Sequence, residues 1–192
     1  MGRSKRNRPH DCPYVGKGGL KLEFALQHFA LPVAGVIAAD LGCNVGGFTD
    51  CLLQHDVGKI YPVDTAYGLL AWKCRTDPRV IVCERTNALS WTPPELLDLV
   101  VSDLGWTRQE RALPLMEALL KPGGKALSLL KPQYEADMSL LVNGVLPEEH
   151  LDGILAGVIA RCPASLRIQG HVRSPYVGSG GNIEFWLLME KR

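Results

Sequence analysis

Residues 36–50 read VIAADLGCNVGGFTD, an apolar run that ends in an acid and leads into a turn rich in glycine. The run over 36–41 has the length of a strand, and a helical pattern begins near residue 46. Gly42, Gly46 and Gly47 permit positive φ and let the backbone come close to a ligand. In α/β sheets, sites for nucleotide-type ligands are built from a strand, a glycine-rich turn and a helix in this order. The segment therefore predicts a ligand site at residues 40–50.

The spacing of the glycines restricts the ligand. The pattern is G-x-x-x-G-G rather than the G-x-G-x-x-G of pyrophosphate-binding dehydrogenases, and no Lys-Ser or Lys-Thr follows it. A dinucleotide is therefore disfavoured, while Asp40 suits a ligand with a cationic or hydroxyl-rich head. S-adenosylmethionine has a sulfonium, a ribose and no phosphate, and it fits. The motif alone leaves a second interpretation open, a plain strand–turn–helix that binds no ligand.

The length and charge of the chain predict one domain with a basic tail. A chain of 192 residues suits a single α/β domain, and its net charge of +1 does not by itself call for nucleic acid. The first twelve residues nevertheless carry Arg3, Lys5, Arg6 and Arg8. We expect 1–12 to be a basic, disordered tail, with contact to phosphates as the alternative, and 13–192 to form the domain.

The cysteines and the apolar runs indicate a cytoplasmic protein. Six cysteines occur without a C-x-x-C pair, so we expect free thiols in a reducing compartment and neither a disulfide framework nor a metal site. The N-terminus has no apolar leader, and no apolar run reaches the roughly 18 residues of a membrane span. We therefore expect no membrane association.

Strand and helix patterns alternate along the chain. Helices are expected at 20–29, 46–55, 67–75, 108–120 and 147–161, and strands at 36–41, 58–64, 79–84, 96–103, 125–131, 166–172 and 182–189. Such alternation predicts an α/β, doubly wound and mostly parallel sheet with helices on both faces. The last two strands are joined without a helix, so the last should run antiparallel. Pro62 lies inside the second strand, where it should cause a local irregularity.

Four charged side chains fall at the carboxyl ends of expected strands, where ligands bind in open α/β sheets. These are Asp40, Asp64, Asp103 and Lys131. Asp64 would accept hydrogen bonds from ribose hydroxyls, and Asn87 lies in a polar turn suited to an adenine edge. Acids suit a sulfonium ligand, but a lysine has no role in binding that cation. Lys131 must therefore pair with an acid or act on a second substrate.

If the second substrate is a ribose hydroxyl, the reaction is an in-line displacement in which the hydroxyl proton must be removed or stabilised. Lys131 precedes Pro132, which holds it in extended geometry at a stiff strand end. A nearby ammonium such as Lys21 would favour a neutral Lys131, whereas Asp103 and Glu184 would oppose this and orient the amine. Of the aromatic residues, Trp106 and Tyr176 lie in loops suited to base stacking, whereas Trp72 is expected in the core.

Several motifs in order resemble the FtsJ-like RNA 2′-O-ribose methyltransferases, in particular their TlyA-like branch. They are PYVGKGGLKL at 13–22, DLG at 40–42, GGFTD at 46–50, AYGLLAWK at 66–73, ERTN at 84–87, LKPQYE at 130–135 and GNIEF at 181–185. The resemblance implies a Rossmann-like fold with a seven-stranded sheet. It also implies a catalytic tetrad of Lys21, Asp103, Lys131 and Glu184, in which Lys131 activates the hydroxyl.

The motifs and the resemblance together give the expected cofactor-binding set for S-adenosyl-L-methionine. It consists of Asp40, Gly42, Asn44, Gly46, Gly47, Phe48, Asp64, Asn87 and Asp103. The resemblance further implies an RNA substrate, with ribosomal RNA or a ribosomal subunit favoured. TlyA proteins carry an N-terminal RNA-binding module. We expect the basic tail to stand in its place here, and a partner protein is then one expected source of RNA binding.

Two departures from the TlyA pattern weaken the transfer of its substrate. They are Cys43-Asn44-Val45 in the glycine turn and the segment 104–108. The main alternative function is a non-catalytic RNA-binding or ribosome-assembly protein that keeps the fold. A membrane-active, hemolysin-like function is disfavoured because the sequence shows no strongly amphipathic basic helix. A base N-methyltransferase is disfavoured because no Pro-Pro-Tyr-like motif follows Asp103.

Overall fold

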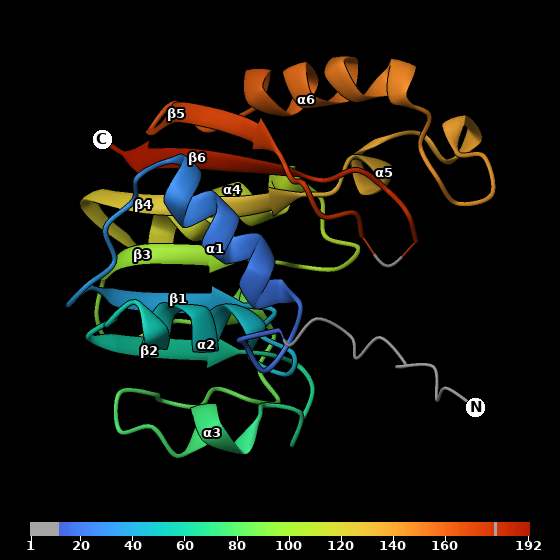
Figure 1. Ribbon diagram of the computed structural model, residues 1–192. Helices are drawn as coiled ribbons and strands as arrows, with labels where there is room; N and C mark the ends of the chain where they lie inside the picture. Colours follow the sequence, from blue (N-terminus) through green and yellow to red (C-terminus); the bar gives the residue numbers. More distant parts are fainter. Residues whose placement is uncertain (1–11, 179) are drawn as a thin grey trace, which may run out of the picture.

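The computed structural model describes residues 12–178 and 180–192, and its centre is a six-stranded sheet in the order β2-β1-β3-β4-β6-β5 (Figure 1). The strands are β1 (Ile37–Leu41), β2 (Lys59–Val63), β3 (Leu97–Ser102), β4 (Leu120–Leu130), β5 (Leu166–Arg173) and β6 (Phe185–Lys191). Among these six strands, β6 alone runs in the opposite direction to the other five. The expected α/β class and antiparallel last strand are confirmed, while the expected tail lies outside the described residues except for Cys12.

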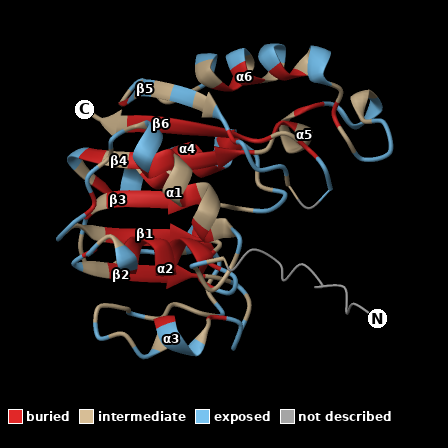
Figure 2. Ribbon diagram, viewed as in Figure 1, coloured by how far each residue is buried: buried red, intermediate tan, exposed pale blue. Residues whose placement is uncertain are grey.

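Helices cover both faces of the sheet because strand residues alternate between two apolar clusters. The helices are α1 (Gly18–His28), α2 (Gly47–Gln54), α3 (Trp72–Arg75), α4 (Gln109–Leu119), α5 (Pro132–Glu135) and α6 (Leu151–Ala160). In β3, Leu99 and Val101 pack with α1 and α2, whereas Val100 packs with α4 and α6. The sheet is therefore the buried middle layer, as Figure 2 shows.

The expected strand at 79–84 is replaced by two isolated parallel bridges, Ile60 to Val80 and Val63 to Cys83, so the sheet has six strands rather than seven. The hydrogen bonds explain the gap. The N–H groups of residues 60 and 64 donate to the carbonyls of 79 and 83, but Pro62 between them has no N–H to offer Ile81. The register with β1 on the other side is unbroken. The irregularity expected at Pro62 is thus confirmed, on the outer side of β2.

The helix expected at 67–75 is reduced to the four residues of α3. Gly68 has φ +74°, and the N–H groups of Gly68 and Leu70 donate to the side chain of Glu84 instead of to a helical carbonyl. Trp72, which was expected in the core, is 75% exposed. The longer helix does not form because the side chain of Glu84, rather than helical carbonyls, accepts hydrogen bonds from these backbone N–H groups.

Two further boundaries differ from the expected ones. Residues 121–124, which separate the helix expected at 108–120 from the strand expected at 125–131, form a bulge within β4, because Leu97 pairs with Leu120 and Leu99 with Lys125. The last strand begins at Phe185 rather than at residue 182, since the Asn182 side chain bonds instead to the backbone of Gly144 and Leu146. Among the described residues, the helices are all too short to cross a membrane.

Candidate active site

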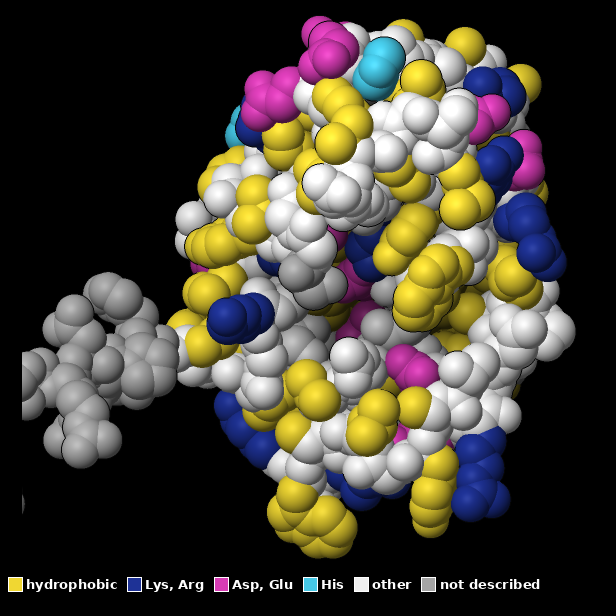
Figure 3. Space-filling view, turned by 90° about the vertical axis from the view of Figure 1, so that its right-hand side faces the viewer, with side chains coloured by type: hydrophobic (Ala, Val, Ile, Leu, Met, Phe, Trp, Pro, Cys, Tyr) yellow, Lys and Arg dark blue, Asp and Glu magenta, His cyan; other side chains and the backbone are white. Residues whose placement is uncertain are grey.

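A cleft of about 600 Å³ opens where the carboxyl ends of β1, β2, β3 and β4 meet. Figure 3 shows this face of the molecule hollowed, with acidic and basic side chains in the hollow. Of the expected site residues, Gly42, Asn44, Asp64, Asn87, Asp103 and Lys131 line the cleft. A smaller adjoining pocket of about 180 Å³ is lined by residues that include Asp40, Gly47 and Phe48. The strand-end residues therefore come together as expected.

The glycine turn allows its own backbone to come close to the backbones of α1 and of the residue after β3. Gly42 has φ +84°, and a Cβ there would lie 2.8 Å from the carbonyl oxygen of Asp103. Gly47 begins α2, and a Cβ on it would lie 2.9 Å from the backbone nitrogen of Gly19 in α1. A side chain at either position would force α1 or the end of β3 away from the turn, so both glycines fix the shape of the site.

Asp40 is fully buried at the end of β1. Its Oδ2 accepts hydrogen bonds from the backbone N–H and the hydroxyl of Thr49, at 3.0 and 2.7 Å, which ties α2 to the strand. Its Oδ1 has no hydrogen-bond partner among the described residues. Burial raises the pKa of Asp40 to about 7, although the bonds from Thr49 act in the opposite direction.

Asp64 is held in place by two backbone donors. Its Oδ2 accepts from the N–H of Asn44 and its Oδ1 from the N–H of Ala66, both at 2.8 Å. Asn44 has φ +49°, a conformation that asparagine tolerates better than most residues. Asn87 is exposed, and its Oδ1 accepts from the N–H of Leu89. Phe48 is buried against Trp186, with ring centroids 5.4 Å apart, so most of its surface packs in the core.

The four residues of the expected tetrad form two ion pairs. Lys21 of α1 contacts Glu184, the residue before β6, with Nζ and Oε2 separated by 2.5 Å. Lys131 contacts Asp103, so the ends of β4 and β3 carry the second pair. Lys131 has φ −113°, the extended geometry expected before proline. Helix, strand ends and a loop thus bring together side chains that lie far apart in the sequence.

The two pairs share one electrostatic environment. The side chain of Glu184 is 2% exposed, and burial raises its pKa, while the hydrogen bond and charge of Lys21 act to lower it. The charge of Asp103 further raises the pKa of Glu184, and that of Lys131 lowers it. Glu184 also lies under the loop that precedes β6, because a Cβ on Gly178 would be 2.7 Å from its Oε1. The arrangement holds two ammonium groups and two carboxylates near the cleft.

Sequence reasoning missed two acids that support the site. The buried side chain of Asp50 accepts from the N–H of Val15 and pairs with Lys73 at 2.7 Å, which fixes the segment before α1. Glu84 pairs with Arg75 at 2.6 Å while it holds the loop at 68–70. The position of Asp50 in the first turn of a helix was a usable signal. For Glu84 the signal was its place in the ERTN motif at 84–87.

Aromatic side chains border the cleft at the end of β3. The rings of Trp106 and Tyr134 both line it, with centroids 6.1 Å apart, and Trp106 is 86% exposed. The Lys131 ammonium lies 6.0 Å from the Tyr134 ring. Tyr176 is also partly exposed. The loop position expected for Trp106 is confirmed, and its role in stacking stays a prediction.

Comparisons with known proteins identify relatives over almost the whole chain. The pattern of the FtsJ-like methyltransferase family matches residues 14–191. The chain is 39% identical over 181 residues to the Bacillus subtilis protein named "Putative rRNA methyltransferase YqxC", covering 91% of this chain and 64% of the relative. It is 36% identical to the 16S/23S rRNA (cytidine-2'-O)-methyltransferase TlyA of Mycobacterium tuberculosis, covering 91% and 67%.

A solved structure shows the same fold. The chain is similar to "a putative hemolysin from Lactococcus lactis", with a TM-score of 0.88, 31% identity, and coverage of 93% of this chain and 89% of the other. The chain spans about two thirds of the length of the two curated relatives. The family pattern extends from the segment before α1 to the end of β6 and includes every strand of the sheet. The chain belongs to the FtsJ-like methyltransferase family.

Proposed function

We propose that this chain methylates the ribose 2′-hydroxyl of an RNA, with S-adenosyl-L-methionine as methyl donor and ribosomal RNA as the favoured substrate. The observation that carries the proposal is the Lys131–Asp103 ion pair at the strand ends, in a cleft bordered by the glycine turn. A methyltransferase that acts on a hydroxyl must hold the oxygen in line with the methyl group and handle its proton. A lysine fixed by a carboxylate suits both tasks. The names of the relatives support RNA as the substrate class.

The residues of the cleft fit the cofactor. Its volume of about 600 Å³ lies within the usual range for ligand sites. Asp64 and Asp103 supply negative charge for a cation, and the Oδ1 of Asp40 is a buried polar atom without a partner among the described residues. Asp64 would hold the ribose, Asn87 the adenine, and the backbone at Gly42 would lie against the ligand. The bound group supplies an electrophilic methyl on sulfur.

The chemistry of the chain then rests on the two ion pairs. Asp103 holds the Lys131 ammonium at the end of β4, where Lys131 binds the ribose hydroxyl and stabilises negative charge as it develops on the oxygen. To act as the base, Lys131 first releases one ammonium proton to solvent. The neutral amine then takes the hydroxyl proton, which restores the ammonium. Glu184 and Lys21 lie close enough to the first pair for their charges to position it. Trp106 offers a stacking surface for a base beside the cleft.

The test uses purified protein, ribosomal subunits or their RNA, and labelled S-adenosyl-L-methionine, with mass spectrometry of the digested nucleosides. We expect a 2′-O-methylated nucleoside, and a loss of about 10²–10⁴-fold in rate for Lys131→Ala with cofactor binding retained. The matched control is Lys59→Ala, which removes a lysine from an ion pair with Glu95 near the start of β2. Normal methylation by Lys131→Ala would contradict the mechanism. RNA binding without any methylated product would instead favour the non-catalytic alternative.

A further inference from the structure

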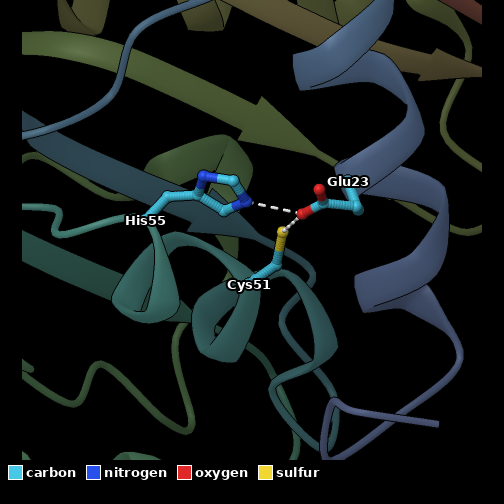
Figure 4. A group of neighbouring side chains, drawn as sticks. All are labelled: Glu23, Cys51 and His55. Carbon is cyan, nitrogen blue, oxygen red and sulfur yellow. Dashed lines mark hydrogen bonds and ion pairs between the residues drawn. The ribbon is translucent and has the colours of Figure 1, made fainter.

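A second cluster of reactive side chains lies between α1 and α2, among residues that do not line the cleft. Glu23 projects from α1, and Cys51 and His55 project from α2 and its C-terminal cap, as Figure 4 shows. The carboxylate oxygen, the ring nitrogen and the sulfur all lie within 4.8 Å of one another. Three side chains with metal-binding atoms therefore point at one small volume.

The spacing within the cluster is close to that of a metal site. Oε2 of Glu23 lies 2.5 Å from Nε2 of His55 and 3.7 Å from Sγ of Cys51. Donors around a tetrahedral zinc lie about 3.3–3.8 Å apart, given bonds of roughly 2.0–2.3 Å. The thiol already meets this distance, and the imidazole need move by only about 1 Å. The side chain of His55 is 37% exposed, which leaves room for that movement.

The surroundings hold the carboxylate as an outer shell would hold a metal ligand. The Tyr14 hydroxyl donates to Oε2 of Glu23 at 2.7 Å, and Gln27 donates to Oε1. Such hydrogen bonds fix the orientation of a ligating group. Cys51 and His55 are four residues apart, so they lie on the same face of α2. Two ligands come from one helix and the third from its neighbour.

We propose that Glu23, Cys51 and His55 form a site for a divalent transition metal of the zinc class, with water in a fourth position. The mixed oxygen, sulfur and nitrogen donor set suits Zn²⁺ better than Mg²⁺ or Ca²⁺, which prefer oxygen alone. On binding, the Cys51 thiol releases its proton to solvent and its sulfur bonds to the metal. The partly exposed His55 and Glu23 provide the entry path, while Cys51 is buried beneath them.

The site would join two helices that shape the cleft. Glu23 lies two residues after Lys21 on α1, and Cys51 lies on the helix that follows the glycine turn. A metal bound to both helices would act as a cross-link and stabilise the folded state by mass action. Zinc at about a hundred times its dissociation constant should raise Tm by about 5–10 °C.

Cobalt(II) is the spectroscopic probe, added to the reduced chain of residues 1–192 after removal of bound metal. We expect visible tetrahedral bands and a thiolate-to-cobalt charge-transfer band that saturate at one equivalent. Cys51→Ser should lose the thiolate band, and His55→Gln should weaken binding at least tenfold. Cys12→Ser and Cys162→Ser are the matched controls, which should keep both the band and the affinity.

His55→Gln keeps the experiment informative if Cys51→Ser does not fold, because His55 is partly exposed and its replacement should be tolerated. We expect zinc to raise the Tm of the native protein and of the two control variants, but not that of His55→Gln. Folded protein without a charge-transfer band, or a band that survives in Cys51→Ser, would overturn the proposal. The cluster would then be a hydrogen-bonded contact between the helices only.

Discussion

Asp40 is a single residue that links the stability of the protein to pH. Its side chain is fully buried, and burial raises its pKa to about 7 from an ordinary value of 3.8. Between these two values the folded protein keeps a proton that the unfolded chain has lost. The free energy of unfolding therefore contains a contribution from Asp40 that is present at low pH and decreases as pH rises through this window.

We predict that Asp40→Asn removes this dependence. An asparagine can still accept from the N–H and hydroxyl of Thr49, but it does not ionise. The unfolding free energy of the native protein relative to the variant should fall by about 3 kcal/mol between pH 4 and pH 7, since one pKa unit corresponds to about 1.36 kcal/mol. Urea unfolding of both proteins at several pH values measures the difference. A difference that does not vary with pH would show that the pKa of Asp40 is not raised in the folded protein.

Gly42 provides a second prediction for a single residue. A Cβ there would lie 2.8 Å from a backbone oxygen, whereas no described atom lies within 4 Å of a Cβ built on Gly35, although φ is positive at both. Gly35→Ala should therefore cost about 1–2 kcal/mol for its backbone conformation alone. Gly42→Ala should lose a further 1–3 kcal/mol, roughly, and weaken cofactor binding. Urea unfolding and calorimetric titration compare the two, and equal losses would contradict the close approach.

Among the elements, the segment at 79–84 shows where a sequence pattern is insufficient. Its composition is that of a strand, but strand pairing needs donors from the neighbour, and Pro62 lacks one at the central position. The carbonyl of Ile81 accepts a weak contact from the Cys83 thiol at 3.5 Å instead. Local preference predicts an extended chain, whereas the neighbouring strand decides whether a ladder forms.

We predict that Pro62→Val strengthens this edge. The substitution restores an N–H that can donate to Ile81, so the two bridges should merge into a continuous ladder. Amide hydrogen exchange at Ile81 and Cys83 should slow by about tenfold, which corresponds to roughly 1.4 kcal/mol of added local stability. Pro94→Val, in an exposed loop outside the strands, is the matched control. Unchanged exchange in Pro62→Val would mean that the missing donor does not limit pairing.

For the candidate site too, local sequence patterns predicted some features, while contacts between distant segments could not be predicted from them. The rule that ligands bind at the carboxyl ends of strands predicted the positions of Asp40, Asp64, Asp103 and Lys131, because each directly follows a buried run. It could not predict that Lys21 meets Glu184. That contact depends on how α1 packs over the sheet. The apolar neighbours of Glu184 indicated that it needs a charged partner, and the family resemblance indicated which lysine. Packing between distant segments is set by the whole core rather than by local periodicity.

For the molecule as a whole, the Lys21–Glu184 pair joins the two ends of the fold, 163 residues apart in the sequence. The pair joins α1 to the residue before β6 and also forms part of the candidate site. Breaking a buried pair by removing one partner is more destabilising than replacing both, because the remaining charge stays buried. Replacing one partner, and then both, therefore distinguishes the contribution of the pair to stability from its contribution to activity.

We predict that Lys21→Met lowers the free energy of unfolding by about 3 kcal/mol, since it leaves the 2% exposed Glu184 without its partner. Lys21→Met combined with Glu184→Leu should recover most of that loss, while methyl transfer stays low in both proteins. Arg173→Ala, which breaks an exposed pair with Glu148, should change stability by less than about 1 kcal/mol. Urea unfolding and nucleoside analysis measure the two effects. A double variant that regains activity together with stability would mean that the pair supports the fold alone, and Lys131 with Asp103 would then carry the chemistry without it.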